Sequence, residues 1–147
     1  MKIHFNISEF LVDPNMTEVP VHVADKIVKY HIPVLNPIRI KLDSPVFISK
    51  HSGYRSTQWE IDDGRDGSSQ HTFGDSIQDF IERDKHWGAV DVTAIDLNGL
   101  LEELKTSDYK RVCYYPKKGF IHCDYKGEEY TYHIDEGSGW KLQGYRK

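Results

Sequence analysis

The fold is decided by the stretch RVCYYPKKGFIHCDYKGEEYTYHI, residues 111–134. Residues 111–115, 120–125 and 129–134 are short runs rich in aromatic and β-branched side chains, which is typical of β-strands. Residues 116–119, Pro-Lys-Lys-Gly, form a four-residue connection of the kind that closes a hairpin. This stretch therefore predicts an antiparallel sheet near the C-terminal end of the chain.

The first third of the chain has the pattern of a helix instead. Between residues 21 and 42 apolar side chains recur every three or four positions, which predicts a helix with one core-facing stripe. Pro33 and Pro37 are expected to break or kink it, because proline lacks the N–H that a helix interior uses. Further strands are predicted at residues 45–49 and 89–94. Helices followed by an antiparallel sheet indicate the α+β class.

Two other segments complete the expected outline. Residues 52–74 are rich in Gly, Ser and Asp and predict a loop, the kind of segment that often carries function on a rigid scaffold. Asp96 is placed to cap a helix that begins at Leu97 and ends near Leu104.

The composition indicates one globular domain over residues 1–147, since a domain usually has ~100–200 residues. Nineteen Lys and Arg against 23 Asp and Glu give a formal charge of −4. A chain with this net charge lacks the positive electrostatic field that is typical of nucleic-acid-binding proteins, so we expect no nucleic-acid partner. No apolar run approaches the ~18–20 residues of a membrane helix, so we expect no membrane span. We expect a monomer.

The opening residues 1–14 contain neither the apolar core nor the small-residue cleavage site of a signal peptide. We therefore expect cytoplasmic synthesis without a signal peptide. The two cysteines, Cys113 and Cys123, are too few for a disulfide scaffold and fit a reducing compartment of synthesis. Because strand neighbours face opposite ways, Cys123 is expected in the core, on the other face from His122.

Two imidazoles and one carboxylate, from His71, Asp91 and His122, lie in or beside the predicted strands. A catalytic zinc takes three protein ligands and leaves a fourth position for water, whose pKa it lowers toward ~7. Strands suit such ligands because rigid elements hold their geometry. From spacing alone, the alternative is that these histidines serve packing or solvent contact.

Four ordered motifs resemble one known family. They are SGYRS at residues 52–56, SQHTFG at 69–74, GAVDV at 88–92 and YPKKGFIHCD at 115–124. Together they are similar to the motifs of the zinc D-Ala-D-Ala carboxypeptidase family, the LAS group of murein peptidases, which also contains the hedgehog fold. The resemblance extends over most of the chain. It implies helices packed on a small antiparallel sheet that carries a zinc site.

The resemblance also implies roles for individual residues. His71, Asp91 and His122 would bind Zn²⁺. Arg55 would lie near the substrate, where its planar guanidinium can bind a carboxylate or a developing oxyanion; a structural ion pair is the alternative. Asp124, two positions after His122, would lie on the same face of the strand and orient a ligand imidazole. By the same resemblance, Trp140 would either line the cleft or pack in the core.

The chain departs from the family pattern in two places. Residues 75–88 are an insertion between the first two ligands, and at the family's spacing the second ligand would be Gln78. Asp75 and Asp79 are nearby rivals, but neither lies in an apolar strand as Asp91 does. The insertion is expected to form either an amphipathic wall or lid of the cleft or a solvated loop.

The second departure concerns the general base. Gly119 occupies a position where many members have an acidic residue. The base that accepts a proton and returns it to the leaving amine is therefore left open among Asp124, His133 and Glu60. His133 is expected on a strand that pairs with that of His122.

The resemblance implies a zinc metallopeptidase that hydrolyses amide bonds in the stem or cross-link peptides of peptidoglycan, as a D-Ala-D-Ala carboxypeptidase or an endopeptidase of endolysin type. Without a signal peptide, such an enzyme would reach the bacterial cell wall by phage- or prophage-type release or as a virion component. The alternative is a non-catalytic cell-wall or virion binding module that retains the fold.

Overall fold

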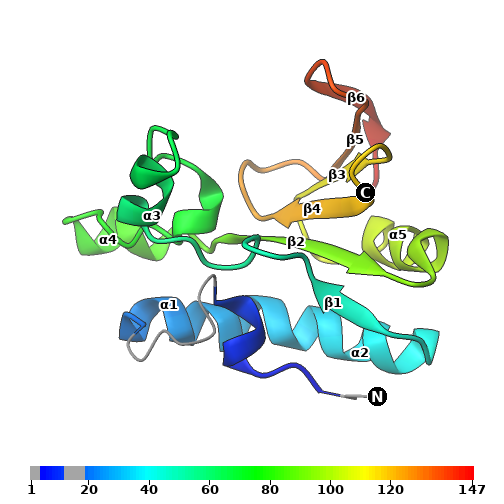
Figure 1. Cartoon of the computed structure of the whole chain (residues 1–147), viewed down its shortest axis with the longest axis horizontal. Helices are drawn as coiled ribbons and strands as arrows, with labels where there is room; N and C mark the ends of the chain where they lie inside the picture. The colour runs from blue at the N-terminus through cyan, green and yellow to red at the C-terminus, as the bar shows by residue number, and fades with distance from the viewer. Residues whose placement is uncertain (1–3, 12–18) are drawn as a thin grey trace.

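The computed structural model describes residues 4–11 and 19–147 (Figure 1). Part of the opening segment on which the signal-peptide expectation rests lies outside these residues. The short 3-10 helix η1 (Ile7–Phe10) precedes the main helical layer. None of the helices in the described parts of the chain is long and apolar enough to cross a membrane.

The helical layer is one long rod on one side of the sheet (Figure 1), made of three consecutive segments. They are α1 (Val21–Lys26), the π-helical turn η2 (Ile27–His31) and α2 (Ile32–Leu42). The expected interruption by proline takes the form of the wider turn η2. Pro33 is the second residue of α2 and follows η2 directly, whereas Pro37 lies inside α2 without ending it.

Over the described residues, the sheet has six strands in the order β1-β2-β4-β3-β5-β6. The α+β class is confirmed, but the expectation of a wholly antiparallel sheet is wrong in one place, because β3 and β5 run parallel. The last strand, β6, was not expected. The strands are β1 (Val46–Ile48), β2 (Ala89–Ala94), β3 (Arg111–Tyr115), β4 (Phe120–Asp124), β5 (Thr131–Asp135) and β6 (Trp140–Tyr145).

The remaining helices are short and lie in the connections. The segment predicted as a loop contains α3 (Thr57–Asp62) and the 3-10 turn η3 (Gln70–Thr72). The Ser56 hydroxyl caps α3 by accepting a hydrogen bond from the N–H of Trp59. The insertion contains α4 (Phe80–Asp84). As expected, Asp96 caps α5 (Leu97–Lys105).

Alternation along the strands separates two chemically different faces of the sheet. The inner face and the helices form one apolar core, with Val90, Val92, Val112, Ile121 and Cys123 from the strands and Val23, Ile27, Leu35, Leu100 and Leu104 from the helices. This confirms Cys123 as a core residue. The other face presents the alternate positions, which carry most of the predicted site residues.

Candidate metal centre

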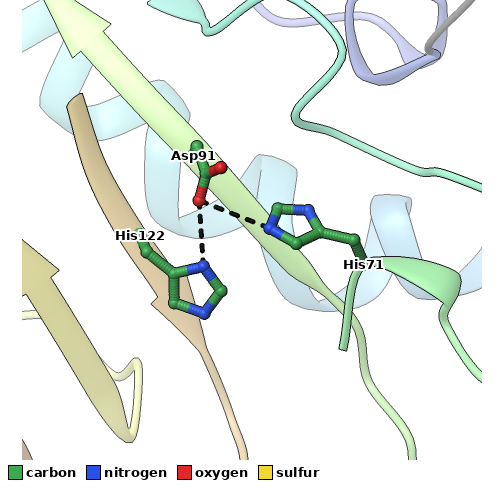
Figure 2. A group of neighbouring side chains, drawn as sticks. All are labelled: His71, Asp91 and His122. Carbon is green, nitrogen blue, oxygen red and sulfur yellow. Dashed lines mark hydrogen bonds and ion pairs between the residues drawn. The ribbon is translucent and has the colours of Figure 1, made fainter. Parts of the chain in front are cut away.

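Three separate elements bring His71, Asp91 and His122 together (Figure 2). His71 lies in η3, in a turn that begins with the Ser69 hydroxyl accepting from the N–H of His71. Asp91 lies in the middle of β2, and His122 is its direct partner across the β2–β4 ladder. Asp91 and His122 are therefore neighbours by strand register, whereas His71 arrives from the loop that packs beside β2.

The three side chains are buried, and one donor atom from each lies within 4.8 Å of the other two. The carboxylate of Asp91 is in the middle: its Oδ1 is 2.9 Å from Nδ1 of His122 and 3.3 Å from Nε2 of His71 (Figure 2). Burial alone would raise the pKa of Asp91, but the two imidazoles hold it below its usual range. Two imidazoles and an ionised carboxylate form a donor set that suits zinc.

A group outside the cluster fixes the orientation of each imidazole. Nδ1 of His71 lies 2.9 Å from the carbonyl oxygen of Gly53, which can only accept, so Nδ1 donates this hydrogen bond and Nε2 is the nitrogen that faces Asp91. Nε2 of His122 lies 2.7 Å from Oδ2 of Asp124. The nitrogens that face Asp91 are therefore Nε2 of His71 and Nδ1 of His122. Such outer hydrogen bonds are typical of metal-binding histidines.

The environment of His122 also fits a bound cation. Burial lowers its pKa, but the hydrogen bonds to Asp124 and Asp91 outweigh burial and raise it to about 9. Both ring nitrogens face carboxylate oxygens, so this place in the fold favours a positive charge. A zinc ion bound there would take the place of the proton on Nδ1 and leave the proton on Nε2 with Asp124.

Asp124 is completely buried and fully engaged. Its two oxygens accept hydrogen bonds from Nε and an Nη of Arg111, at 2.8 and 2.5 Å, in addition to the contact with His122. The N–H of Lys126 donates to the same carboxylate. Burial would raise the pKa of Asp124, but His122 and Arg111 lower it below its usual range. The geometry places Asp124 as the residue that orients His122.

Arg55 and Glu60 form a second buried group beside η3. The N–H of Arg55 donates to the carbonyl oxygen of His71, and Nε of Arg55 lies 3.3 Å from Oε2 of Glu60. Glu60 is completely buried in α3, and its Oε2 also accepts from the Ser69 hydroxyl at 2.6 Å. Burial lowers the pKa of Arg55, while the charges of Asp91 and Glu60 oppose this. Arg55 therefore forms the ion pair that was the alternative to a substrate-binding role, and it lies beside the cluster of His71, Asp91 and His122.

His133 does not lie on a neighbour of β4, so that expectation is wrong. Both edges of β4 are occupied by β2 and β3, and β5 pairs with β3, where His133 is opposite Cys113. The ring of Trp140 contacts the rings of both His122 and His133, with centroids 5.2 and 5.1 Å apart. His133 is thus on the same face as the cluster, across the indole of Trp140.

Asp75 and Asp79, the alternatives to Asp91 as the metal-binding carboxylate, have other partners. The Asp75 carboxylate accepts from the hydroxyls of Tyr54 and Thr57, and Asp79 caps α4. The insertion at 75–88 is held against the N-terminal helices, because Lys26 donates to the carbonyl oxygens of Phe73 and Arg83.

Two contributors were missed at the sequence level, the Gly53 carbonyl and Arg111. No sequence pattern indicates the contact made by the Gly53 carbonyl. The position of Arg111 could have been predicted, because a turn at residues 116–119 pairs Tyr115 with Phe120 and therefore places Arg111 opposite Asp124.

A family model described as Peptidase M15 matches residues 3–124, which include the three clustered residues, Arg55 and Asp124. The chain belongs to the peptidase M15 family. M15 enzymes are zinc metallopeptidases of the D-Ala-D-Ala carboxypeptidase type, and the resemblance seen in the four motifs is thereby confirmed. Neither the curated proteins nor the solved structures yield a match. The M15 match ends at Asp124, so β5 and β6 lie beyond it.

Proposed function

We propose that this M15 protein is a zinc-dependent peptidoglycan peptidase that hydrolyses amide bonds of murein stem or cross-link peptides, as a D-Ala-D-Ala carboxypeptidase or an endopeptidase of endolysin type. The observation that carries the proposal is the buried cluster of His71, Asp91 and His122, with both imidazoles oriented by outer hydrogen bonds. Zinc held there would polarise the scissile carbonyl and supply a water of lowered pKa.

The chain's own residues supply positioning and charge. Arg55 is fixed through its backbone to His71 and through its side chain to Glu60, and its guanidinium can hydrogen-bond the carbonyl oxygen as negative charge develops. Asp124 keeps the ring of His122 in one orientation. Because Arg111 and His122 occupy both its oxygens, Asp124 is the weakest of the three base candidates.

The two other candidates differ in their surroundings. Glu60 is sealed from solvent and is paired with Arg55. His133 is half-buried, and its Nδ1 has no hydrogen-bond partner among the residues that the structure describes. Burial together with the charge of Arg111 lowers its pKa. A neutral imidazole can accept a proton, which supports His133 as the proton acceptor.

The test is digestion of purified sacculi in zinc-replete buffer, with mass spectrometry of the released muropeptides. We expect new peptide ends from the unsubstituted protein and none from His71→Ala or His122→Ala, which also lose zinc. His4→Ala, a change at an exposed histidine, is the matched control and keeps both properties. Full digestion by the His71→Ala/His122→Ala double variant would refute the zinc mechanism.

The second candidate function is a non-catalytic cell-wall or virion binding module. Gly119 favours it, because this tight turn position, with φ of 75°, lacks the acid that many relatives have. Sacculi that are bound but yield no new peptide ends would support the module. In either case we propose that the protein acts at the bacterial cell wall after phage- or prophage-type release.

A further inference from the structure

A groove of about 500 Å³ lies next to the metal centre, at the connection between β4 and β5. Most of it is formed by residues beyond the M15 match. It is lined by Arg111, Lys126, Gly127, Glu128, Glu129, Thr131 and His133.

The groove and the metal centre share a wall. Arg111 lines the groove, and its guanidinium holds the carboxylate of Asp124, whose Oδ2 contacts Nε2 of His122. The guanidinium also lies over the ring of Trp140, 4.7 Å from its centroid, and that ring contacts His122. One side chain, Asp124, therefore separates the groove wall from a residue of the cluster.

The charges along the groove are of both signs. Arg111 and Lys126 bring positive charge to it, and Glu128 and Glu129 bring negative charge. Within the described residues, no ion pair or hydrogen bond involves the ammonium of Lys126 or the carboxylates of the two glutamates. The charges of Lys126, Glu128 and Glu129 are therefore available to a ligand, whereas Arg111 is paired with Asp124. This leaves the groove complementary to a ligand that carries an ammonium and a carboxylate close together.

We propose that this groove is a subsite for the zwitterionic end of a substrate amino acid, with the ammonium toward Glu128 and Glu129 and the carboxylate toward Lys126 and Arg111. A diamino acid whose side chain ends in an α-amino acid group has this chemistry. The proposal rests on the proposed peptidase function and narrows its substrate to stem peptides that carry such a residue.

The test uses three synthetic stem peptides that differ only at the end of the diamino acid side chain. One has diaminopimelate with its distal ammonium and carboxylate free, one has that amine acetylated, and one has that carboxylate amidated. We expect kcat/KM for the free form to exceed each blocked form by about threefold or more, the size of one partly exposed charge pair. The preference shrinks at high ionic strength, because salt screens exposed charges.

Variants assign each charge to its residue. Glu128→Gln/Glu129→Gln removes the preference for the free amine over the acetylated form, and Lys126→Gln reduces that for the free carboxylate. The matched controls, Glu102→Gln/Glu136→Gln and Lys117→Gln, change exposed residues outside the groove and retain both preferences.

A second readout does not depend on turnover. In NMR titrations with diaminopimelate alone, the indole signal of Trp140 and the ring signals of His133 shift, and the shifts weaken with N-acetylated diaminopimelate. Equal cleavage of all three peptides, without such shifts, overturns the subsite and leaves the peptidase intact. Cleavage of none of them, while diaminopimelate still shifts these signals, instead contradicts the peptidase function.

Discussion

The Nε2 atom of His122 lies 2.7 Å from Oδ2 of Asp124, and this contact determines which nitrogen of His122 faces the cluster. Without it, the imidazole could rotate or exchange tautomers, and Nδ1 would no longer be held beside Asp91. The same carboxylate receives two hydrogen bonds from Arg111, so the orientation of His122, a candidate metal-binding residue, depends on a cation in the neighbouring strand.

Asp124→Asn is therefore expected to weaken zinc binding by about 10- to 100-fold, the usual effect of removing an outer partner of a metal-bound histidine. A competition titration against a chromophoric chelator measures it. Asp108→Asn, at an exposed aspartate, is the matched control and keeps the zinc affinity. Unchanged affinity in Asp124→Asn would show that His122 is oriented by other contacts.

Glu60→Ala is expected to lower the free energy of unfolding by about 3 kcal/mol, because it leaves the buried charge of Arg55 without its partner. Glu60→Gln is expected to cost less, because an amide oxygen still accepts from the Ser69 hydroxyl. Urea titrations of the two variants and of the exposed control Glu102→Gln give the ranking. A smaller loss for Glu60→Ala than for Glu60→Gln would contradict it.

Gly88→Ala tests the close approach at the start of β2. Gly88 and Gly64 have nearly the same backbone, with φ of 88° and 87°, so alanine is strained at both by about 1–2 kcal/mol. At Gly88 a Cβ would also overlap the ring of Phe73, whereas at Gly64 no atom of the described part of the chain lies within 4 Å of a Cβ. Gly88→Ala should therefore lower stability by about 1–3 kcal/mol more than Gly64→Ala. Equal losses, measured by urea unfolding, would show that the ring moves aside freely.

The buried side chain of Lys26 predicts that the stability of the folded protein depends on pH. Burial is the main cause that lowers its pKa from 10.5 to about 8 in the folded protein, with Asp84 opposing and Arg83 adding to the effect. Between pH 8 and 10.5 the unfolded chain then binds more protons at this site than the folded one, so stability from this group rises with pH. Below pH 8 both states are protonated and the contribution is constant.

Lys26→Met has no such titration. We expect this variant to be less stable, because the bonds to Phe73 and Arg83 are lost, and its deficit relative to the unsubstituted protein to grow from pH 8 to 10. Thermal unfolding at several pH values measures the difference. A deficit that shrinks over this interval would show that the pKa of Lys26 is not lowered by folding.

Local patterns predicted much of the fold and most of the candidate site. The three-and-four spacing from residue 21 to 42 predicted the helical rod, and the hairpin turn at 116–119 was found where expected. Asp91 stood out because a carboxylate inside an apolar strand has a burial cost that needs a partner. The motifs around Arg55 and His71 indicated the peptidase family to which the chain belongs.

The chain order alone could not specify how distant segments pair. That β5 lies beside β3 instead of β4, and that His133 therefore lies across Trp140 from His122, depends on strand pairings between residues far apart. The insertion also gave no sign of its docking onto the N-terminal helices through Lys26.

The sequence by itself determined the chemistry: two imidazoles, a carboxylate and a guanidinium in strand and loop positions that suit a metal peptidase. The tertiary structure decided which atoms meet. Gly53 presents a carbonyl to His71, and Arg111 holds Asp124 against His122. The physical reason is that residue type and periodicity are local properties, whereas the orientation of a buried side chain depends on hydrogen-bond partners supplied by other parts of the chain.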